Sequence, residues 1–198
     1  DDQGQPLDSS TVSFGGWVEK PWYMLDGTHP GAQDYLRMVF RTMREKWHCR
    51  YFKLDANTWG ALPWGHRHDP NATAIEAYRA GMQALREGAG EGSFVLGCNA
   101  ALWPSLGTVH GMRVTNDIKY NWRCIRGLAE QGFPRNWQNQ ALWISDPDNL
   151  VLCNHEQIFV GFSRTDTDVS ENEFSFHAAY ILASGGMILA GDRMMALQ

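Results

Sequence analysis

The sequence predicts an α/β fold built on a parallel sheet. Segments with apolar residues at helical spacing alternate with short apolar runs suited to buried strands, and start or stop signals typical of helices flank the helical segments. The chain has 198 residues with 43% hydrophobic content, enough apolar material for one globular core. Right-handed crossovers between such strands would curl the sheet towards a barrel or a doubly wound sheet.

The first predicted helix starts at Thr28-His29-Pro30, where a proline in the first turn is tolerated. Apolar residues then recur at helical spacing, so the buried stripe of this helix is expected to comprise Leu36, Val39, Phe40, Met43 and Trp47. The segment from Arg50 to Asp55 follows as the first strand.

A loop rich in Gly, Pro and His leads to a capping box at Thr73–Glu76, which starts the second helix. Its inward-facing residues are expected to be Ile75, Tyr78, Met82 and Leu85. Gly88, Gly90 and Gly92 are expected to end this helix. The short apolar run from Ser93 to Cys98 then predicts a strand buried on both faces.

Three more strands are predicted later in the chain, at 111–116, 141–145 and 187–190. A capping box at Ser170–Glu173 starts the helix before the last of them, and 150–153 with 158–162 could form an inserted hairpin. A complete eight-stranded barrel takes typically ~250 residues. The sequence therefore predicts residues 1–198 as the later part, about strands four to eight, of a (β/α)₈ TIM barrel.

Composition excludes several classes of protein. The net charge is −5, and Lys and Arg form no basic stripe that could follow a nucleic acid backbone. No apolar stretch is long enough to span a membrane. Four widely spaced cysteines without a CxxC pair favour reduced thiols; these are Cys49, Cys98, Cys124 and Cys153. The location stays open, with a weak preference for the cytoplasm. Association into a homo-oligomer stays open.

Two predicted strands end in an acid that shares a strand face with a cation. Because side chains alternate along a strand, Lys53 lies on the face of Asp55, and Arg113 on the face of Asp117. Both acids stand where βα loops begin, the edge at which barrel enzymes carry their active sites. This placement predicts that Asp55 and Asp117 are a catalytic pair.

A pair of carboxylates is the machinery of glycoside cleavage. One acid attacks the anomeric carbon or activates water, and the other protonates the departing oxygen. Lys53 would keep Asp55 ionised as the nucleophile, whereas a more deeply buried and less hydrogen-bonded Asp117 would act as the general acid. A carboxyl separation of ~5–5.5 Å predicts retention, and ~6.5–9.5 Å predicts inversion.

Other residues are secondary candidates. Cys98 ends the strand between the two acid-bearing strands and would either line the pocket or fill the core. Trp143 and Asp146 are suited to stack on a sugar and to accept hydroxyl protons, although Asp146-Pro147-Asp148 also fits a plain turn. Asp192 would bind substrate or cap a turn. A metal site could in principle use His66, His68 and Asp69, but their spacing is no zinc pattern.

Several motifs together resemble the catalytic barrel of glycoside hydrolase family 36 α-galactosidases. The similarity covers about residues 23–192, and the motifs that carry it, in order, are Tyr51–Ala61, Ala77–Met82, Phe94–Cys98, Gly111–Asp117 and Asp146–Asp148. The sequence departs from the family pattern at Asn99, at Thr115-Asn116 in place of a Gly-Pro-like pair, and in a short 122–140 segment.

The resemblance implies a retaining hydrolase of clan D that cleaves terminal α-galactosides without a metal or cofactor. It implies Asp55 as nucleophile and Asp117 as acid/base, with Lys53, Cys98 and Arg113 contacting the galactose ring. The early barrel strands and the flanking β-rich domains are expected to lie outside the chain, so the isolated piece is expected to be inactive. The rivals are an α-N-acetylgalactosaminidase, a raffinose-type galactosyl transferase and a non-catalytic sugar-binding barrel.

Overall fold

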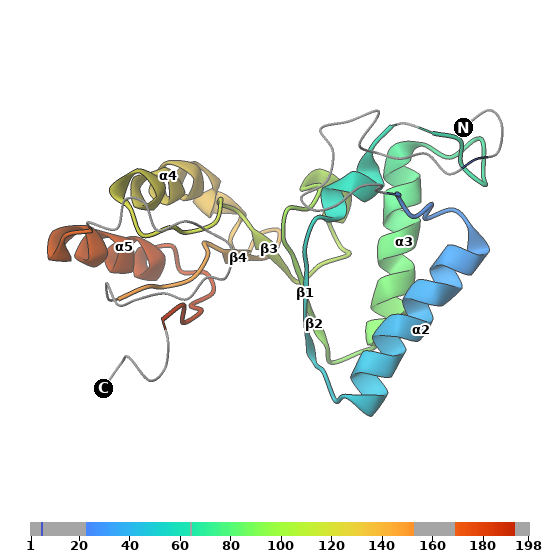
Figure 1. Cartoon of the computed structure of the whole chain (residues 1–198), viewed down its shortest axis with the longest axis horizontal. Helices are drawn as coiled ribbons and strands as arrows, with labels where there is room; N and C mark the ends of the chain where they lie inside the picture. The colour runs from blue at the N-terminus through green and yellow to red at the C-terminus, as the bar shows by residue number, and fades with distance from the viewer. Residues whose placement is uncertain (1–4, 6–22, 64, 153–168, 193–198) are drawn as a thin grey trace. The chain divides into compact units, whose positions relative to one another are not determined.

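The computed structural model describes residues 5, 23–63, 65–152 and 169–192, which fall into two compact units, Asp1–His110 and Gly111–Gln198. Helices and parallel strands alternate in both (Figure 1). None of the described helices combines the length and apolarity that a bilayer span requires.

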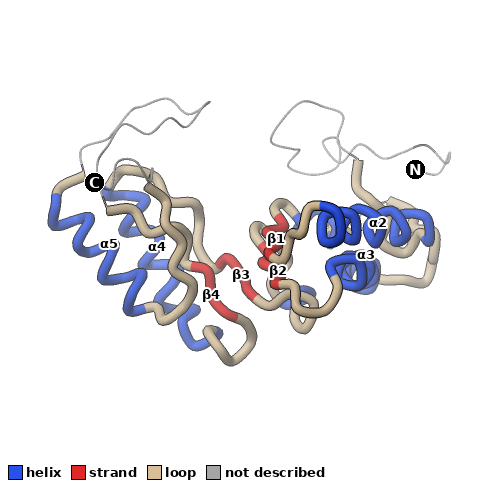
Figure 2. The backbone as a smooth tube through the Cα atoms, turned by 90° about the horizontal axis from the view of Figure 1, so that it is seen from below, coloured by secondary structure: helices blue, strands red, loops and turns tan. Residues whose placement is uncertain are grey.

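The first unit is a βαβ arrangement with an additional helix in front of it. Helix α2 (Pro30–Lys46) leads into β1 (Tyr51–Leu54), and α3 (Ala74–Ala89) connects β1 to its parallel partner β2 (Phe94–Gly97). Short 3₁₀ helices η1 (Asn57–Ala61) and η2 (Trp103–Ser105) follow the two strands. Figures 1 and 2 show α2 and α3 side by side along the strand pair.

The predicted helix starts of the first unit are confirmed. The His29 side chain accepts a hydrogen bond from the Gly31 N–H at 3.0 Å, and Pro30 is the first residue of α2. Thr73 and Glu76 form the complete capping box of α3. Such caps satisfy N–H groups that have no partner within the helix, typically for ~1 kcal/mol each.

Packing of the helices against one face of the strands creates the core of this unit. Phe52 and Leu54 of β1 are buried, and the Phe52 ring meets Phe40 of α2 edge-on at 5.3 Å. On the opposite strand face Tyr51 stacks on Phe94 with ring centroids 5.7 Å apart. The strand alternation predicted from the sequence is therefore present in β1.

Three details of the first unit differ from prediction. Trp47 caps the end of α2 and is 67% exposed, and Ile75 in the first turn of α3 is 53% exposed, because both lie at helix ends beyond the packed stripe. Gly88 does not end α3 but lies within it, pressed against the backbone of Arg37 in α2. The helix ends instead at Gly90, which adopts φ +69°.

The second unit repeats the βαβ pattern. β3 (Gly111–Arg113) is connected by α4 (Trp122–Gly132) and the 3₁₀ helix η3 (Phe133–Gln138) to its parallel partner β4 (Ile144–Asp146). Helix α5 (Glu171–Ala183) starts with the predicted capping box of Ser170 and Glu173. Ile125, Val151, Val169 and Phe174 form one buried cluster, and Leu128, Ala129, Tyr180 and Ile181 form another.

Predictions for the end of the chain need correction. β4 begins at Ile144 rather than at Ala141, because Ala141 and Leu142 turn back to bond the Gln138 carbonyl oxygen. The expected strand 187–190 is reduced to one parallel bridge, Leu150 to Ala190. Pro147 has no N–H, and Asp148 has φ +75°, so the ladder breaks before it can lengthen.

The first arm of the hairpin predicted from 150–153 and 158–162 pairs with another segment of the chain. Leu150 pairs with Ala190, and its N–H donates to the Leu189 carbonyl oxygen at 2.7 Å. Residues 153–168, which include the second arm of the predicted hairpin, lie outside the described residues.

The close contact at Gly88 generates a stability prediction. A Cβ at this position would stand 2.5 Å from the Arg37 carbonyl oxygen and 3.0 Å from the Phe40 Cβ. We expect Gly88→Ala to lower the free energy of unfolding by about 1–3 kcal/mol because of this overlap. The overlap is expected to outweigh the ~1 kcal/mol by which alanine favours a helix over glycine. Chemical denaturation of the full-length protein measures the change.

Gly127 provides the matched control, since it is also helical but a Cβ there would meet nothing within 4 Å. Gly127→Ala is expected to stabilise the protein by up to about 1 kcal/mol. Equal effects of the two substitutions would contradict the close packing of α2 on α3.

Candidate active site

Asp55 stands immediately beyond β1, on the strand face opposite the helices. Tyr51, Lys53 and Asp55 are exposed while Phe52 and Leu54 are buried, so the predicted shared face of Lys53 and Asp55 is confirmed. One carboxyl oxygen of Asp55, Oδ1, accepts a hydrogen bond from the Ala56 N–H at 2.8 Å. This bond fixes the carboxylate at the start of the βα loop.

The backbone after Asp55 is in a conformation that non-glycine residues rarely adopt. Ala56 has φ +62° in the left-handed region, which costs energy for a residue with a Cβ. Such conformations persist where the surrounding structure requires them, and they are concentrated at functional sites. The turn therefore sets the direction of the chain directly after Asp55.

Cys98 lies beside Asp55 at the end of the neighbouring strand. The parallel register pairs Lys53 with Leu96, and the Cys98 N–H donates to the Leu54 carbonyl oxygen at 2.7 Å. Continuing that register by two residues puts Cys98 next to Asp55 on the same face. Cys98 is 5% exposed, so its side chain is buried.

The departure from the family pattern at Asn99 has a structural reason. Asn99 has φ +44°, a conformation that Asn tolerates better than most residues, and its carbonyl oxygen accepts from the Thr58 N–H at 3.0 Å. The residue thus ties the loop after β2 to the loop after β1, the loop that begins at Asp55.

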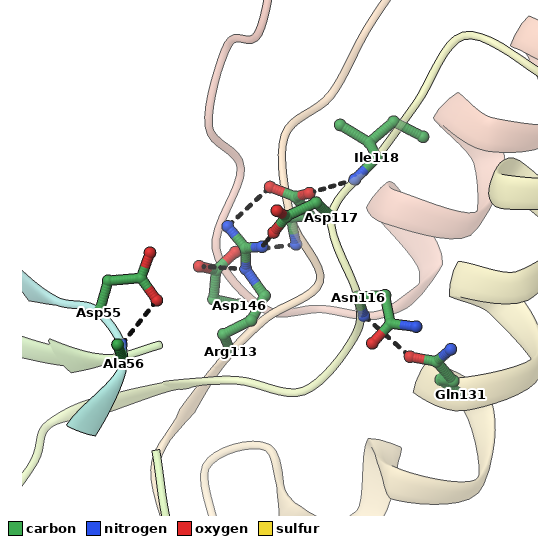
Figure 3. Close-up of polar contacts among 9 residues, drawn as sticks. Asp55, Ala56, Arg113, Asn116, Asp117, Ile118, Gln131 and Asp146 are labelled. Carbon is green, nitrogen blue, oxygen red and sulfur yellow. Dashed lines mark hydrogen bonds and ion pairs between the residues drawn. The ribbon is translucent and has the colours of Figure 1, made fainter. Parts of the chain in front are cut away.

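Arg113, the last residue of β3, is the centre of a charge cluster in the second unit. Its Nε lies 3.0 Å from Asp146 and its Nη1 2.9 Å from Asp117 (Figure 3). Its Nη2 lies 2.7 Å from Asp148. The arginine side chain is only 4% exposed, and those of Asp146 and Asp148 are 0% and 3% exposed. Such buried charges persist only with good geometry and further hydrogen bonds.

Backbone groups supply those further hydrogen bonds. Asp146 also accepts from the Asp148 N–H at 2.8 Å, and Asp148 also accepts from the Ile118 N–H. The predicted pairing of Arg113 with an acid is therefore present, and it involves three acids rather than one.

Asp117 differs in environment from what the catalytic prediction required. Its side chain is 82% exposed rather than buried, and its Oδ1 accepts from Arg113. Within the described residues its Oδ2 has no hydrogen-bond partner, so this oxygen is the one available to a ligand. Asp117 is thus anchored through one oxygen and open at the other.

The Thr115-Asn116 departure also has a role in the second unit. The Asn116 N–H donates to the Gln131 side chain of α4 at 2.8 Å, a bond that a proline in this position could not make (Figure 3). Sequence reasoning missed Gln131, because no pattern in the sequence links a helix side chain to a loop N–H fifteen residues earlier.

Asp146 and Trp143 do not have the surroundings that were expected of sugar ligands. Asp146 is 0% exposed and engaged with Arg113, and Trp143 is 4% exposed, which leaves its ring no open face for stacking. Asp192 accepts from the Leu152 N–H at 2.7 Å, a contact that the sequence did not predict, and the turn it was expected to cap lies outside the described residues.

The His-rich loop is hydrogen-bonded to the segment that precedes α2. Asp26, which sequence analysis did not select, accepts from the His68 N–H at 2.6 Å and from both the N–H and the hydroxyl of Thr28. Burial raises the pKa of Asp26, but these bonds and nearby Arg67 outweigh burial, so its pKa falls below the ordinary value. No group of three or more potential metal ligands occurs in the part of the chain that the structure describes.

Together, parallel βαβ units with polar residues beyond the strand ends define the class of fold: the chain is part of a TIM barrel of the kind found in glycosidases. The sequence matches no protein-family model. The similarity to solved structures is clear, with TM-scores above 0.6.

The particular proteins it is similar to include TtGalA, an α-galactosidase from Thermus thermophilus in complex with stachyose (TM-score 0.72, 24% identity, covering 100% of this chain and 41% of that one). Another is Abp, a GH27 β-L-arabinopyranosidase from Geobacillus stearothermophilus (TM-score 0.64, 17% identity, covering 87% of this chain and 39% of that one). The chain thus spans about two fifths of these proteins. Family 27 belongs to the same clan as family 36.

The buried cluster generates a stability prediction. Asp146→Ala leaves the buried Arg113 without one of its partners, and we expect the free energy of unfolding to fall by about 3–5 kcal/mol. Chemical denaturation of the full-length protein provides the value.

Glu130→Ala is the control, because Glu130 pairs with Arg126 at 3.1 Å on the exposed surface of α4. Its effect is expected to stay within about 0.5 kcal/mol. A loss for Asp146→Ala no larger than that of the control would show that the cluster contributes little to folding.

Proposed function

We propose that the protein is a retaining glycoside hydrolase that cleaves terminal α-galactosides, with Asp55 as nucleophile and Asp117 as acid/base. The observation that carries the proposal is the position of the two acids. Each follows the carboxyl end of a parallel strand, in a fold shared with solved glycosidases, and this end of the strands carries the active site in barrel enzymes.

The surroundings of Asp55 suit a nucleophile. Its Oδ1 is held by the Ala56 N–H, so the carboxylate is oriented before substrate arrives. Lys53 and Cys98 lie on the same face, where an ammonium and a thiol could contact ring hydroxyls without displacing the core. These contacts would hold the anomeric carbon against Asp55.

Asp117 has the second role in this proposal, that of the acid/base. Arg113 holds Oδ1, which leaves Oδ2 to deliver a proton to the departing oxygen and to take one from water in the second step. All three of the Arg113 nitrogens are already engaged with carboxylates. We therefore expect Arg113 to act on the sugar chiefly through Asp117.

The substrate class rests on the solved neighbours. TtGalA has been solved in complex with stachyose and with p-nitrophenyl α-D-galactopyranoside, both α-galactosides. The β-L-arabinopyranosidase neighbour makes the corresponding pentoside a useful second substrate, since β-L-arabinopyranose has the ring configuration of α-D-galactopyranose without the hydroxymethyl group. The two alternative activities to assay are hydrolysis of α-N-acetylgalactosaminides and transfer of galactose to a sugar acceptor.

The proposal is tested by substituting each acid in the full-length protein and adding azide. We expect Asp55→Gly to lose about 10⁴-fold or more in kcat on p-nitrophenyl α-D-galactopyranoside. Azide enters the space left by Asp55 and attacks from its side of the ring, so the expected product is the β-galactosyl azide. With Asp117→Gly the enzyme intermediate still forms, and azide then yields the α-galactosyl azide.

Asp34→Asn is the control, because Asp34 is a 78% exposed acid on α2 whose ion pair is with Arg37 of the same helix. It is expected to leave kcat unchanged. If Asp55→Gly gave the α-galactosyl azide and Asp117→Gly the β-galactosyl azide, the roles of nucleophile and acid/base would have to be exchanged. A wild-type protein that binds galactose without turnover would instead support the non-catalytic sugar-binding alternative.

A further inference from the structure

Asp148 contacts both the arginine that holds Asp117 and the backbone next to Asp117. Its Oδ1 lies 2.7 Å from Nη2 of Arg113, and its Oδ2 accepts from the N–H of Ile118. Nη1 of the same guanidinium bonds Asp117. A single carboxylate thus reaches Asp117 by two routes, through its side-chain partner and through the residue that follows it.

The position of Asp148 is itself tightly determined. It is 2% exposed, its backbone has φ +75°, and its N–H donates to Asp146 at 2.8 Å. A left-handed conformation at a residue other than glycine persists only when surrounding bonds hold it. Here Asp146 holds the backbone while Arg113 and Ile118 hold the side chain, so the carboxylate has little freedom.

A second contact holds the other side of the Asp117 segment. Gln131 of α4 accepts from the Asn116 N–H at 2.8 Å (Figure 3). The residues before and after Asp117 therefore each donate a backbone N–H to a side chain from another element. The Asp117 carboxyl group is exposed, but the backbone that carries it is fixed on both sides.

These contacts leave Asp148 unsuited to binding a sugar directly. Both of its oxygens are engaged, and its side chain is 3% exposed. The same holds for Asp146, which the sequence had suggested as a ligand for sugar hydroxyls. The two carboxylates of the Asp146-Pro147-Asp148 turn therefore contact Arg113 and the segment around Asp117 rather than solvent.

We infer that Asp148 is a positioning residue for Asp117, and that Gln131 gives the second hold on the same segment. The inference rests on the proposed function, in which Asp117 donates a proton to the leaving group. If Asp117 is displaced, proton donation weakens, and the loss is greatest for leaving groups that most need the proton.

The test compares kcat/KM on aryl α-galactosides whose leaving phenols range from weakly to strongly acidic. Asparagine at 148 keeps one acceptor oxygen, so it can serve Arg113 or Ile118 but not both. We expect the loss of kcat/KM in Asp148→Asn to be about tenfold or more greater on the phenyl glycoside than on the 2,4-dinitrophenyl glycoside. The reason is that 2,4-dinitrophenol departs with little help from a proton donor. Gln131→Met is expected to give the same pattern at smaller size.

Glu173→Gln is the matched control. Glu173 is also an acid of the second unit that accepts a backbone N–H, that of Ser170 at 2.7 Å, but it touches neither Arg113 nor the Asp117 segment. Its dependence on the leaving group is expected to equal that of wild type. A loss in Asp148→Asn that is uniform across the leaving groups, or no loss, would overturn the positioning role. Should Asp148→Asn not fold, Gln131→Met decides by the same criterion.

Failure of the proposed function can be told apart from failure of this inference. If the wild-type protein turns over no galactoside, the proposed function fails, and crystal structures of wild type and Asp148→Asn decide the positioning alone. Displacement of the Asp117 carboxyl group from Arg113 supports the inference. An Asp117 that keeps its place and its contact with Arg113 overturns it.

Discussion

The guanidinium of Arg113 organises the polar part of the second unit. One buried cation meets three carboxylates, two of them buried and one exposed, at distances of 2.7 to 3.0 Å. Removing such a cation from water is costly, and the cost is offset only because each buried carboxylate also accepts a backbone N–H. The requirement to satisfy Arg113 thus determines the conformation of the turn after β4 and anchors Asp117 after β3.

In the first unit a simpler constraint has the same effect. Because side chains alternate along a strand, Phe52 and Leu54 of β1 face the helices, and Lys53 and Asp55 lie on the other face. The left-handed residues Ala56 and Asn99 then turn the chain away from the strand ends. Both units therefore present an acid beyond a strand end, the first through a left-handed turn and the second through an ion-pair cluster.

Much of this fold follows from the sequence, because the signals are local. The capping boxes and the buried residues Tyr78, Met82 and Leu85 depend on spacing within one helix, and they agree with the structure. Trp47 was predicted wrongly because periodicity does not show where the neighbouring element ends. The last predicted strand was wrong in extent because its partner contains the Pro147-Asp148 turn.

The candidate site was predictable to a different degree. The placement of Asp55, Lys53 and Cys98 at neighbouring strand ends agrees with the prediction, because it depends on alternation and on the order of two parallel strands. The contacts of Asp146, Asp148 and Gln131 were not, since they join positions 15 to 35 residues apart whose pairing no short pattern encodes. An isolated acid in a sequence looks the same whether it will bind a ligand or an arginine.

The central claim is that Asp55 and Asp117 act on one glycosidic bond. A crystal structure of the full-length protein with galactose bound measures this directly, through the distance between the two carboxyl groups. The retaining mechanism requires ~5–5.5 Å, with the anomeric carbon between them. A separation well beyond ~10 Å, outside the range of either glycosidase mechanism, would contradict the account.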